Sequence, residues 1–160
     1  MCYLASNIHE FLISLLTPLI AVIATYIAYQ QWQIRKEHFQ LELFDKRYKV
    51  YLSTKEFISK IIKHGYPSED EILKFVEATN DSVFLFDEKL QNRLNLYLNR
   101  GEDLYYLNIR IALTESSSNE AENKISADKE SELQEWFQKE FKQLSALFYK
   151  YLKIKSKFIN

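Results

Sequence analysis

Residues 11–29 read FLISLLTPLIAVIATYIAY, a run without a charged side chain. As an α-helix this run would be roughly 28 Å long, at about 1.5 Å per residue, which is close to the thickness of a bilayer's hydrocarbon core. Tyr26, Tyr29 and Trp32 lie at one end of it, where aromatic side chains favour the membrane interface. Membrane helices tolerate a proline such as Pro18 as a mild kink. The sequence therefore predicts one transmembrane helix over residues 11–30.

Two other interpretations of this run fit less well. A secretory signal peptide would begin with basic residues, and residues 1–10 contain no Lys or Arg. A buried core helix is the second alternative, but nineteen uncharged residues are long for one. Arg35 and Lys36 follow the run closely. By the positive-inside rule we expect a single-pass protein of the inner (cell) membrane, with residues 1–10 outside and residues 31–160 in the cytoplasm.

A stripe of small residues runs along the predicted membrane helix at spacings of three and four: Ser14, Thr17, Ala21, Ala24 and Ala28. Small side chains let membrane helices approach closely, and this spacing is that of a left-handed helix pair. We therefore expect the stripe to be a packing face of a homo-oligomer in the lipid bilayer. A conducting pore lined by Ser14, Thr17 and Thr25 is an alternative. The simplest alternative is that Ala and Thr are common in any membrane helix.

The rest of the chain predicts an all-α fold. Only two Gly and two Pro occur in 160 residues, and strands need turn residues to reverse direction. Apolar residues keep a helical spacing from Ile34 through Leu41 and Tyr48 to Ile62. We therefore expect the membrane helix to continue as one long helix to His64, ended by Gly65, with other helices covering its apolar face.

The remaining elements follow from caps, breaks and periodicity. A capping box formed by Ser68 and Glu71 begins the first of them, and the helix around Gly101 is expected to be continuous. The predicted elements are helices over residues 69–79, 88–113 and 127–157, a short apolar plug at 83–86 for which a strand is an alternative, and a mobile polar loop at 115–126. Residues 31–160 are thus expected to form a cytoplasmic bundle of three long helices and one short one.

No catalytic, cofactor-binding or metal-binding motif emerges. The single cysteine, Cys2, excludes an internal disulfide and a cysteine-based metal cluster. The three histidines share no metal-ligand spacing, and two glycines cannot form a Gly-rich phosphate loop. Carboxylate groups gather at residues 69–71, 87–88 and 102–103, where helix starts and solvated faces account for them. We expect a protein that is not an enzyme, and a net charge of −1 gives no pull toward nucleic acid.

Basic residues gather on the part of the long helix nearest the membrane: Arg35, Lys36, Lys46, Arg47 and Lys49. Such residues attract anionic head groups, although a solvated helix face that also carries the topology signal explains them as well. Four lysines, at positions 150, 153, 155 and 157, close the last helix, where cations suit the helix dipole.

Three stretches of the chain carry a resemblance: YIAYQQWQIRK (26–36), LELFDKRYKVYLSTKEFI (41–58) and FVEATNDSVFLFDEKL (75–90), joined by the pair Trp136–Phe137. With these the chain resembles an uncharacterised family of small bacterial single-pass membrane proteins. The resemblance implies one membrane helix followed by a helical cytoplasmic domain, and it implies no activity.

Two functions are compatible with this plan. The first is a membrane-anchored interaction or scaffold module that self-associates or binds a cytoplasmic protein partner through its aromatic-rich bundle. The alternative is a membrane-disrupting or pore-forming effector, for example in bacterial antiviral defence. That alternative rests on the small-residue stripe and on the simple plan of one helix and one small domain.

Overall fold

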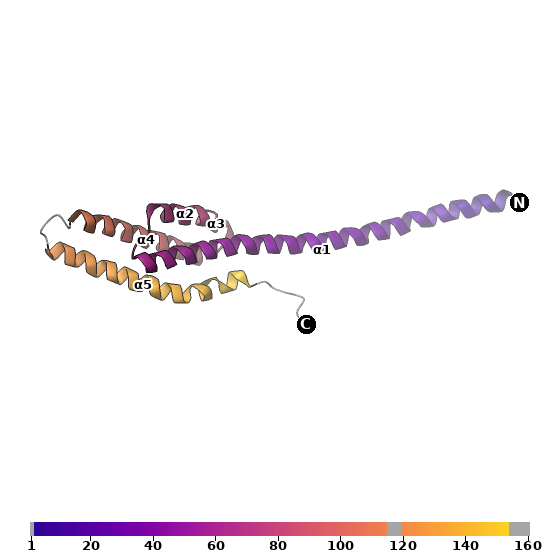
Figure 1. The fold of residues 1–160 in the computed structure, drawn as a ribbon. Helices are drawn as coiled ribbons and strands as arrows, with labels where there is room; N and C mark the ends of the chain where they lie inside the picture. The colour runs from indigo at the N-terminus through magenta and orange to yellow at the C-terminus, as the bar shows by residue number, and fades with distance from the viewer. Residues whose placement is uncertain (1, 115–119, 154–160) are drawn as a thin grey trace. The chain divides into compact units, whose positions relative to one another are not determined.

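The chain is helical in a computed structural model that describes the backbone of residues 2–114 and 120–153, and side chains from residue 14 on except at 15, 17, 114 and 120–124 (Figure 1). The helices are α1 (Cys2–His64), α2 (Glu69–Thr79), α3 (Ser82–Leu85), α4 (Glu88–Thr114) and α5 (Glu120–Leu152). No strand occurs in the described backbone, so the predicted all-α class is confirmed.

The helices belong to two compact units, which are described separately. The N-terminal unit comprises residues 1–42, whose described part belongs to α1, and the bundle comprises residues 43–160. Helix α1 ends at His64, as predicted. Gly65 follows with φ +89°, a left-handed conformation that favours glycine, and its N–H donates to the carbonyl oxygen of Ile61 at 2.7 Å.

Within the bundle, α4 and α5 lie side by side, and α2 and α3 pack against α4 (Figure 1). The buried core draws on α1, α2, α4 and α5 and on Phe86 beside α3: Val50, Phe57, Ile58, Ile61, Phe75, Phe86, Leu90, Leu94, Tyr97, Leu104, Leu107, Leu133, Phe137, Leu144 and Phe148. In the last helix Leu133, Phe137, Leu144 and Phe148 are buried at spacings of four and seven residues, and Phe141 and Tyr151 are half-buried beside them.

The core contacts only part of the broad apolar face expected for α1: Val50, Phe57, Ile58 and Ile61 are buried. Tyr48 and Ile62 remain 41% and 37% exposed, whereas Phe57 is 3% exposed. Gly101 explains why the side of α1 with Phe57 faces the core, since a Cβ added at Gly101 would lie 2.6 Å from Cζ of Phe57. The missing side chain lets the Phe57 ring approach α4, which runs through Gly101 without a break as predicted. The other helices therefore cover the side of α1 that carries Phe57.

The connections between helices confirm one prediction and refine another. The capping box is present: the Glu71 N–H donates to Oγ of Ser68 at 3.4 Å, and the Ser68 N–H donates to Oε2 of Glu71 at 2.9 Å. The apolar plug at residues 83–86 contains a single helical turn, α3, rather than a strand. This apolar segment is only partly buried, because Phe86 is buried while Phe84 is 85% exposed.

The predicted loop and final helix are shifted. Helix α5 begins at Glu120, so residues 120–126, expected in a mobile loop, are helical. Their sequence EAENKIS contains the helix formers Glu, Ala and Lys, and this propensity outweighs their polar character. Residues 115–119 lie outside the described ranges. The helix ends at Leu152 rather than at 157, and Lys155 and Lys157 also lie outside the described residues.

Candidate interaction surfaces

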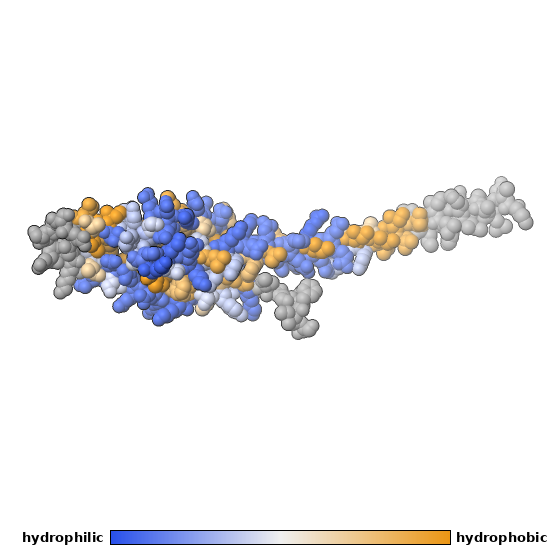
Figure 2. Space-filling view, in the orientation of Figure 1, coloured by the Kyte–Doolittle hydropathy of each residue, from blue (hydrophilic) through white to orange (hydrophobic). Residues whose placement is uncertain are grey.

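The N-terminal unit exposes a continuous apolar surface. Twelve large apolar side chains described between residues 16 and 41 are each 49–67% exposed: Leu16, Leu19, Ile20, Val22, Ile23, Tyr26, Ile27, Tyr29, Trp32, Ile34, Phe39 and Leu41. Figure 2 shows a mostly orange stretch along this part of α1, followed by a stretch in which orange is mixed with blue. A single helix that is apolar on all sides is normally covered by lipid or by other protein.

A search of the described residues finds no helix with an apolar stretch long enough to cross a membrane. Part of the predicted span, at residues 11–13, 15 and 17, lies outside the described side chains.

The predicted packing face is exposed wherever its side chains are described. Ser14, Ala21, Ala24 and Ala28 lie on the surface of α1, and Thr17 is outside the described side chains. Thr25 lies beside this stripe, and its Oγ1 donates to the carbonyl oxygen of Ala21 at 2.8 Å. A hydroxyl bonded to its own helix needs no water or partner.

The predicted membrane-proximal basic residues divide into two kinds. Arg35, Lys36, Lys46 and Lys49 are exposed, and Nζ of Lys36 lies 5.4 Å from the centre of the Trp32 ring. Arg47 is half-buried instead. Its Nε donates to the carbonyl oxygen of Leu85 at 3.1 Å, and its Nη1 donates to that of Tyr151 at 3.3 Å. Arg47 therefore joins α1 to the ends of α3 and α5 within the bundle.

Asp87 organises a second polar cluster nearby, which the sequence did not predict. It caps α4, because the Leu90 N–H donates to its Oδ1 at 3.1 Å. Nζ of Lys150 donates to Oδ2 at 2.7 Å, and the Tyr151 hydroxyl donates to Oδ1. The hydrogen bond from Lys150, followed by that from Tyr151, lowers the pKa of the Asp87 carboxyl from 3.8 to about 2.

A buried polar network joins α4 to α5 farther along the bundle. The Tyr97 hydroxyl donates to Oε2 of Glu140 at 2.8 Å, and Nη2 of Arg93 lies 3.4 Å from Oε1. Burial, and then the bond to Glu140, raises the pKa of Tyr97. These residues border a groove of about 260 Å³, and the Arg100 guanidinium lies 4.1 Å from the centre of the Trp136 ring. The network holds two helices in register.

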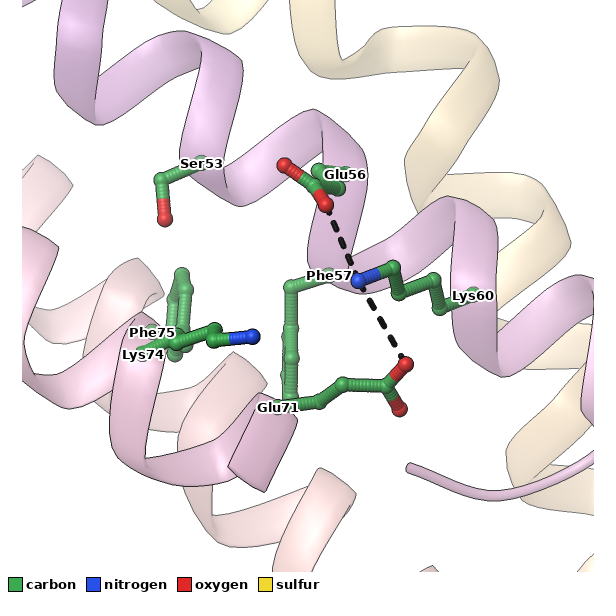
Figure 3. Close-up of a pocket in the computed structure, with 7 residues that line it drawn as sticks. All are labelled: Ser53, Glu56, Phe57, Lys60, Glu71, Lys74 and Phe75. Atoms are coloured by element: carbon green, nitrogen blue, oxygen red, sulfur yellow. Dashed lines mark ion pairs between the residues drawn. The ribbon is translucent and has the colours of Figure 1, made fainter. Parts of the chain in front are cut away.

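A smaller hollow between α1 and α2 has Lys60 at its mouth (Figure 3). Nζ of Lys60 lies 2.9 Å from Oε1 of Glu56 and 3.4 Å from Oε1 of Glu71. The stacked rings of Phe57 and Phe75, with centres 4.4 Å apart, line it. Its volume of about 40 Å³ has room for a few waters only. This hollow is therefore a packing feature that ties α1 to α2.

A larger groove lies between the C-terminal part of α4 and the N-terminal part of α5, with a volume of about 580 Å³. Apolar side chains make most of its wall, and Tyr106, Ile109 and Leu113 are 66%, 37% and 72% exposed. Asp103, Arg110 and Lys129 also line it. An apolar groove with charged residues among its lining residues suits a protein partner. We call it the distal groove.

The described residues contain no group of three His, Cys, Asp or Glu side chains that could hold a metal ion. The described residues offer two candidate interaction surfaces: the apolar face of α1 and the distal groove. Comparisons of the chain with family models, with curated proteins and with solved structures found no match.

Proposed function

We propose that this protein is a membrane-anchored helical interaction module that self-associates and presents its bundle to the cytoplasm. The observation that carries the proposal is the apolar face of α1, whose twelve large side chains are 49–67% exposed in the N-terminal unit. Lipid suits residues 16–29 because no charge interrupts them. Fully exposing such a surface to water would oppose the hydrophobic effect.

The charge distribution supports the orientation. Arg35 and Lys36 are exposed just beyond the uncharged run, and basic residues prefer the cytoplasmic side of a membrane. Trp32 and Tyr29 precede them, with ring centres 6.2 Å apart, where an aromatic belt belongs. We therefore propose that the N-terminus lies outside the inner membrane and the bundle inside the cell.

The distal groove supports an interaction role for the bundle. Exposed aromatic and aliphatic side chains anchor protein interfaces, and Tyr106 and Leu113 are the most exposed of those in this groove. The expected partner is a cytoplasmic protein that offers an apolar side chain to the groove.

Self-association is tested by co-expressing two full-length copies with different tags. After membranes are dissolved in mild detergent, capture of one tag should recover the other copy. Mixing the two copies only after solubilisation is the control, and it should recover much less. Equal recovery from both samples, or none from either, would contradict self-association in the membrane.

The same cells separate this role from membrane disruption. An interaction module leaves the membrane potential intact, so a potential-sensitive dye should report no change on induction. Loss of potential that follows induction of this chain, and not of a variant lacking residues 11–30, would favour the effector instead.

A further inference from the structure

A second stripe along α1 of the N-terminal unit consists of large side chains. Ile20, Ile27, Ile34 and Leu41 follow one another at seven-residue intervals, and Leu16 and Ile23 lie between them at spacings of three and four. All six are 49–57% exposed. A strict seven-residue apolar repeat keeps one face of a helix toward a second helix in a left-handed coiled coil.

The stripe continues where lipid can no longer cover it. Ile34 and Leu41 lie beyond the uncharged run, in a stretch that also carries Arg35, Lys36 and Glu37. Lipid tails do not accept such charges on the helix surface. The N-terminal unit contains no helix other than α1 that could shield Ile34 and Leu41. A second protein helix, rather than lipid, would cover these two side chains.

We propose that the partner is a second copy of this chain, paired in parallel along α1. The inference rests on the proposed function, because anchoring in one membrane gives every copy the same direction. A parallel pair in register brings Ile34 of one copy against the same residue of the other, so a single face is self-complementary. Confinement to the membrane also raises the effective concentration of each copy for the other.

Polar residues at the seam fit a defined register. Gln30 and Glu37 occupy the positions between Ile27, Ile34 and Leu41 in the repeat. A few polar residues at such positions fix the alignment and number of helices, at a cost in stability. The neighbouring positions are Gln31, Gln33, His38 and Gln40, so no carboxylates flank the seam, but Glu37 of one copy faces Glu37 of the other, and this like-charge contact lowers the stability of the pair.

The stripe offers an extended contact surface for a pair. If each of the six apolar side chains loses roughly 80 Å² of exposed area, the pair buries on the order of 1,000 Å² in total from these residues alone. That is near the lower limit of specific interfaces, and the flanking glutamines add to it. The small-residue stripe lies on another side of the helix and ends at Ala28.

Cysteine cross-linking in native membranes tests the pairing. The full-length chain with Cys2→Ser serves as background, and single substitutions Ile34→Cys and Leu41→Cys probe the seam. Trp32→Cys and Phe39→Cys are matched controls, because these side chains are 57% and 66% exposed on the opposite side of the same turns. Mild oxidation should give about tenfold more disulfide-linked dimer at the seam than at the controls, since proximity sets the rate.

The outcomes separate the pairing from the proposed function. Equal dimer at all four positions, more at the controls or none at any would overturn the pairing while the protein stays in the membrane pellet. Release of the protein from the membrane by an alkaline wash would overturn the proposed function and the pairing with it. As a second variant, Ile34→Glu with Leu41→Glu should abolish recovery of one tagged copy by another, whereas Trp32→Glu with Phe39→Glu should not.

Discussion

Tyr97 and Glu140 show how single residues hold the bundle together. The Tyr97 side chain is completely buried, and its partner Glu140 is 6% exposed. Glu140 is ionisable and would be costly to bury alone, but the Tyr97 hydroxyl and Arg93 both contact it. The network therefore stabilises the fold only while its partners stay together.

Replacing Tyr97 by Phe should lower the free energy of unfolding by about 1–2 kcal/mol, because it removes a hydrogen bond to a nearly buried carboxylate. Thermal melting of the detergent-solubilised chain measures the change. Tyr149→Phe is the matched control, since Tyr149 is 64% exposed, and it should alter stability by less than about 0.5 kcal/mol. Equal losses in both variants would show that the network contributes nothing.

The lowered pKa of Asp87 predicts that the stability of the fold depends on pH in the acidic range. Its pKa is lowered to about 2 in the folded chain, chiefly by the hydrogen bond from Lys150. A lowered pKa means that the stabilisation is present above about pH 4 and is lost as the pH falls toward about 2. Asp87→Asn should therefore melt at a lower temperature than the natural chain at about pH 5, and the difference should shrink near pH 2. A constant difference across this range would contradict the role of the ionised carboxylate.

The sequence predicted those structural features that depend only on residues close together in the chain. The Ser68–Glu71 capping box and the Gly65 helix end are local patterns, and both are confirmed. The partners of Asp87 could not be predicted, since Lys150 lies 63 positions away and only the packing of α5 brings it close. Arg47 was assigned to the basic surface for the same reason, although two carbonyl oxygens of the bundle hold it.

The close packing of α1 against α4 depends on Gly101. A methyl group at this position would meet the Phe57 ring at 2.6–3.1 Å, and that ring is hemmed in by Phe75. Gly101→Ala should gain up to about 1 kcal/mol of helix propensity but lose about 1–3 kcal/mol to overpacking. Thermal melting should show a net loss.

The shorter side chain of Phe57→Leu provides the control for this prediction. In the Phe57→Leu background, Gly101→Ala should lower the free energy of unfolding by less than it does in the natural chain, because the crowded ring is absent. If the two substitutions were simply additive, the close approach of α1 to α4 at Gly101 would not be the cause.

Helix α1 also shows where periodicity fails as a guide. Its sequence carries apolar side chains on more than one side, and periodicity alone did not say which side the bundle would bury. Gly101, on a different helix, makes the side with Phe57 the inner one. The start of α5 was missed for a different reason: polar residues 120–126 were assigned to a loop, although Glu, Ala and Lys favour a helix there.

The bundle buries large apolar side chains in its own core, whereas the part of α1 in the N-terminal unit leaves its large apolar side chains exposed. Fifteen apolar side chains form one buried cluster in the bundle, whereas the large side chains described in the N-terminal unit are exposed. The all-α class and the long first helix could be predicted from the sequence, since they follow from composition and periodicity. What surrounds the first helix does not follow from composition and periodicity; in the proposed function it is the membrane and other copies of the chain.

Alkaline extraction of membranes tests the membrane anchor most directly. The full-length chain should remain in the membrane pellet, and so should a control with Val83→Arg and Phe84→Arg, which adds the same charges at exposed sites of the bundle. A variant with Ile20→Arg and Ile23→Arg should appear in the soluble fraction, because each charge at the centre of a membrane helix costs about 3 kcal/mol. Extraction of the natural chain, or retention of the Ile20–Ile23 variant, would contradict anchoring by this segment.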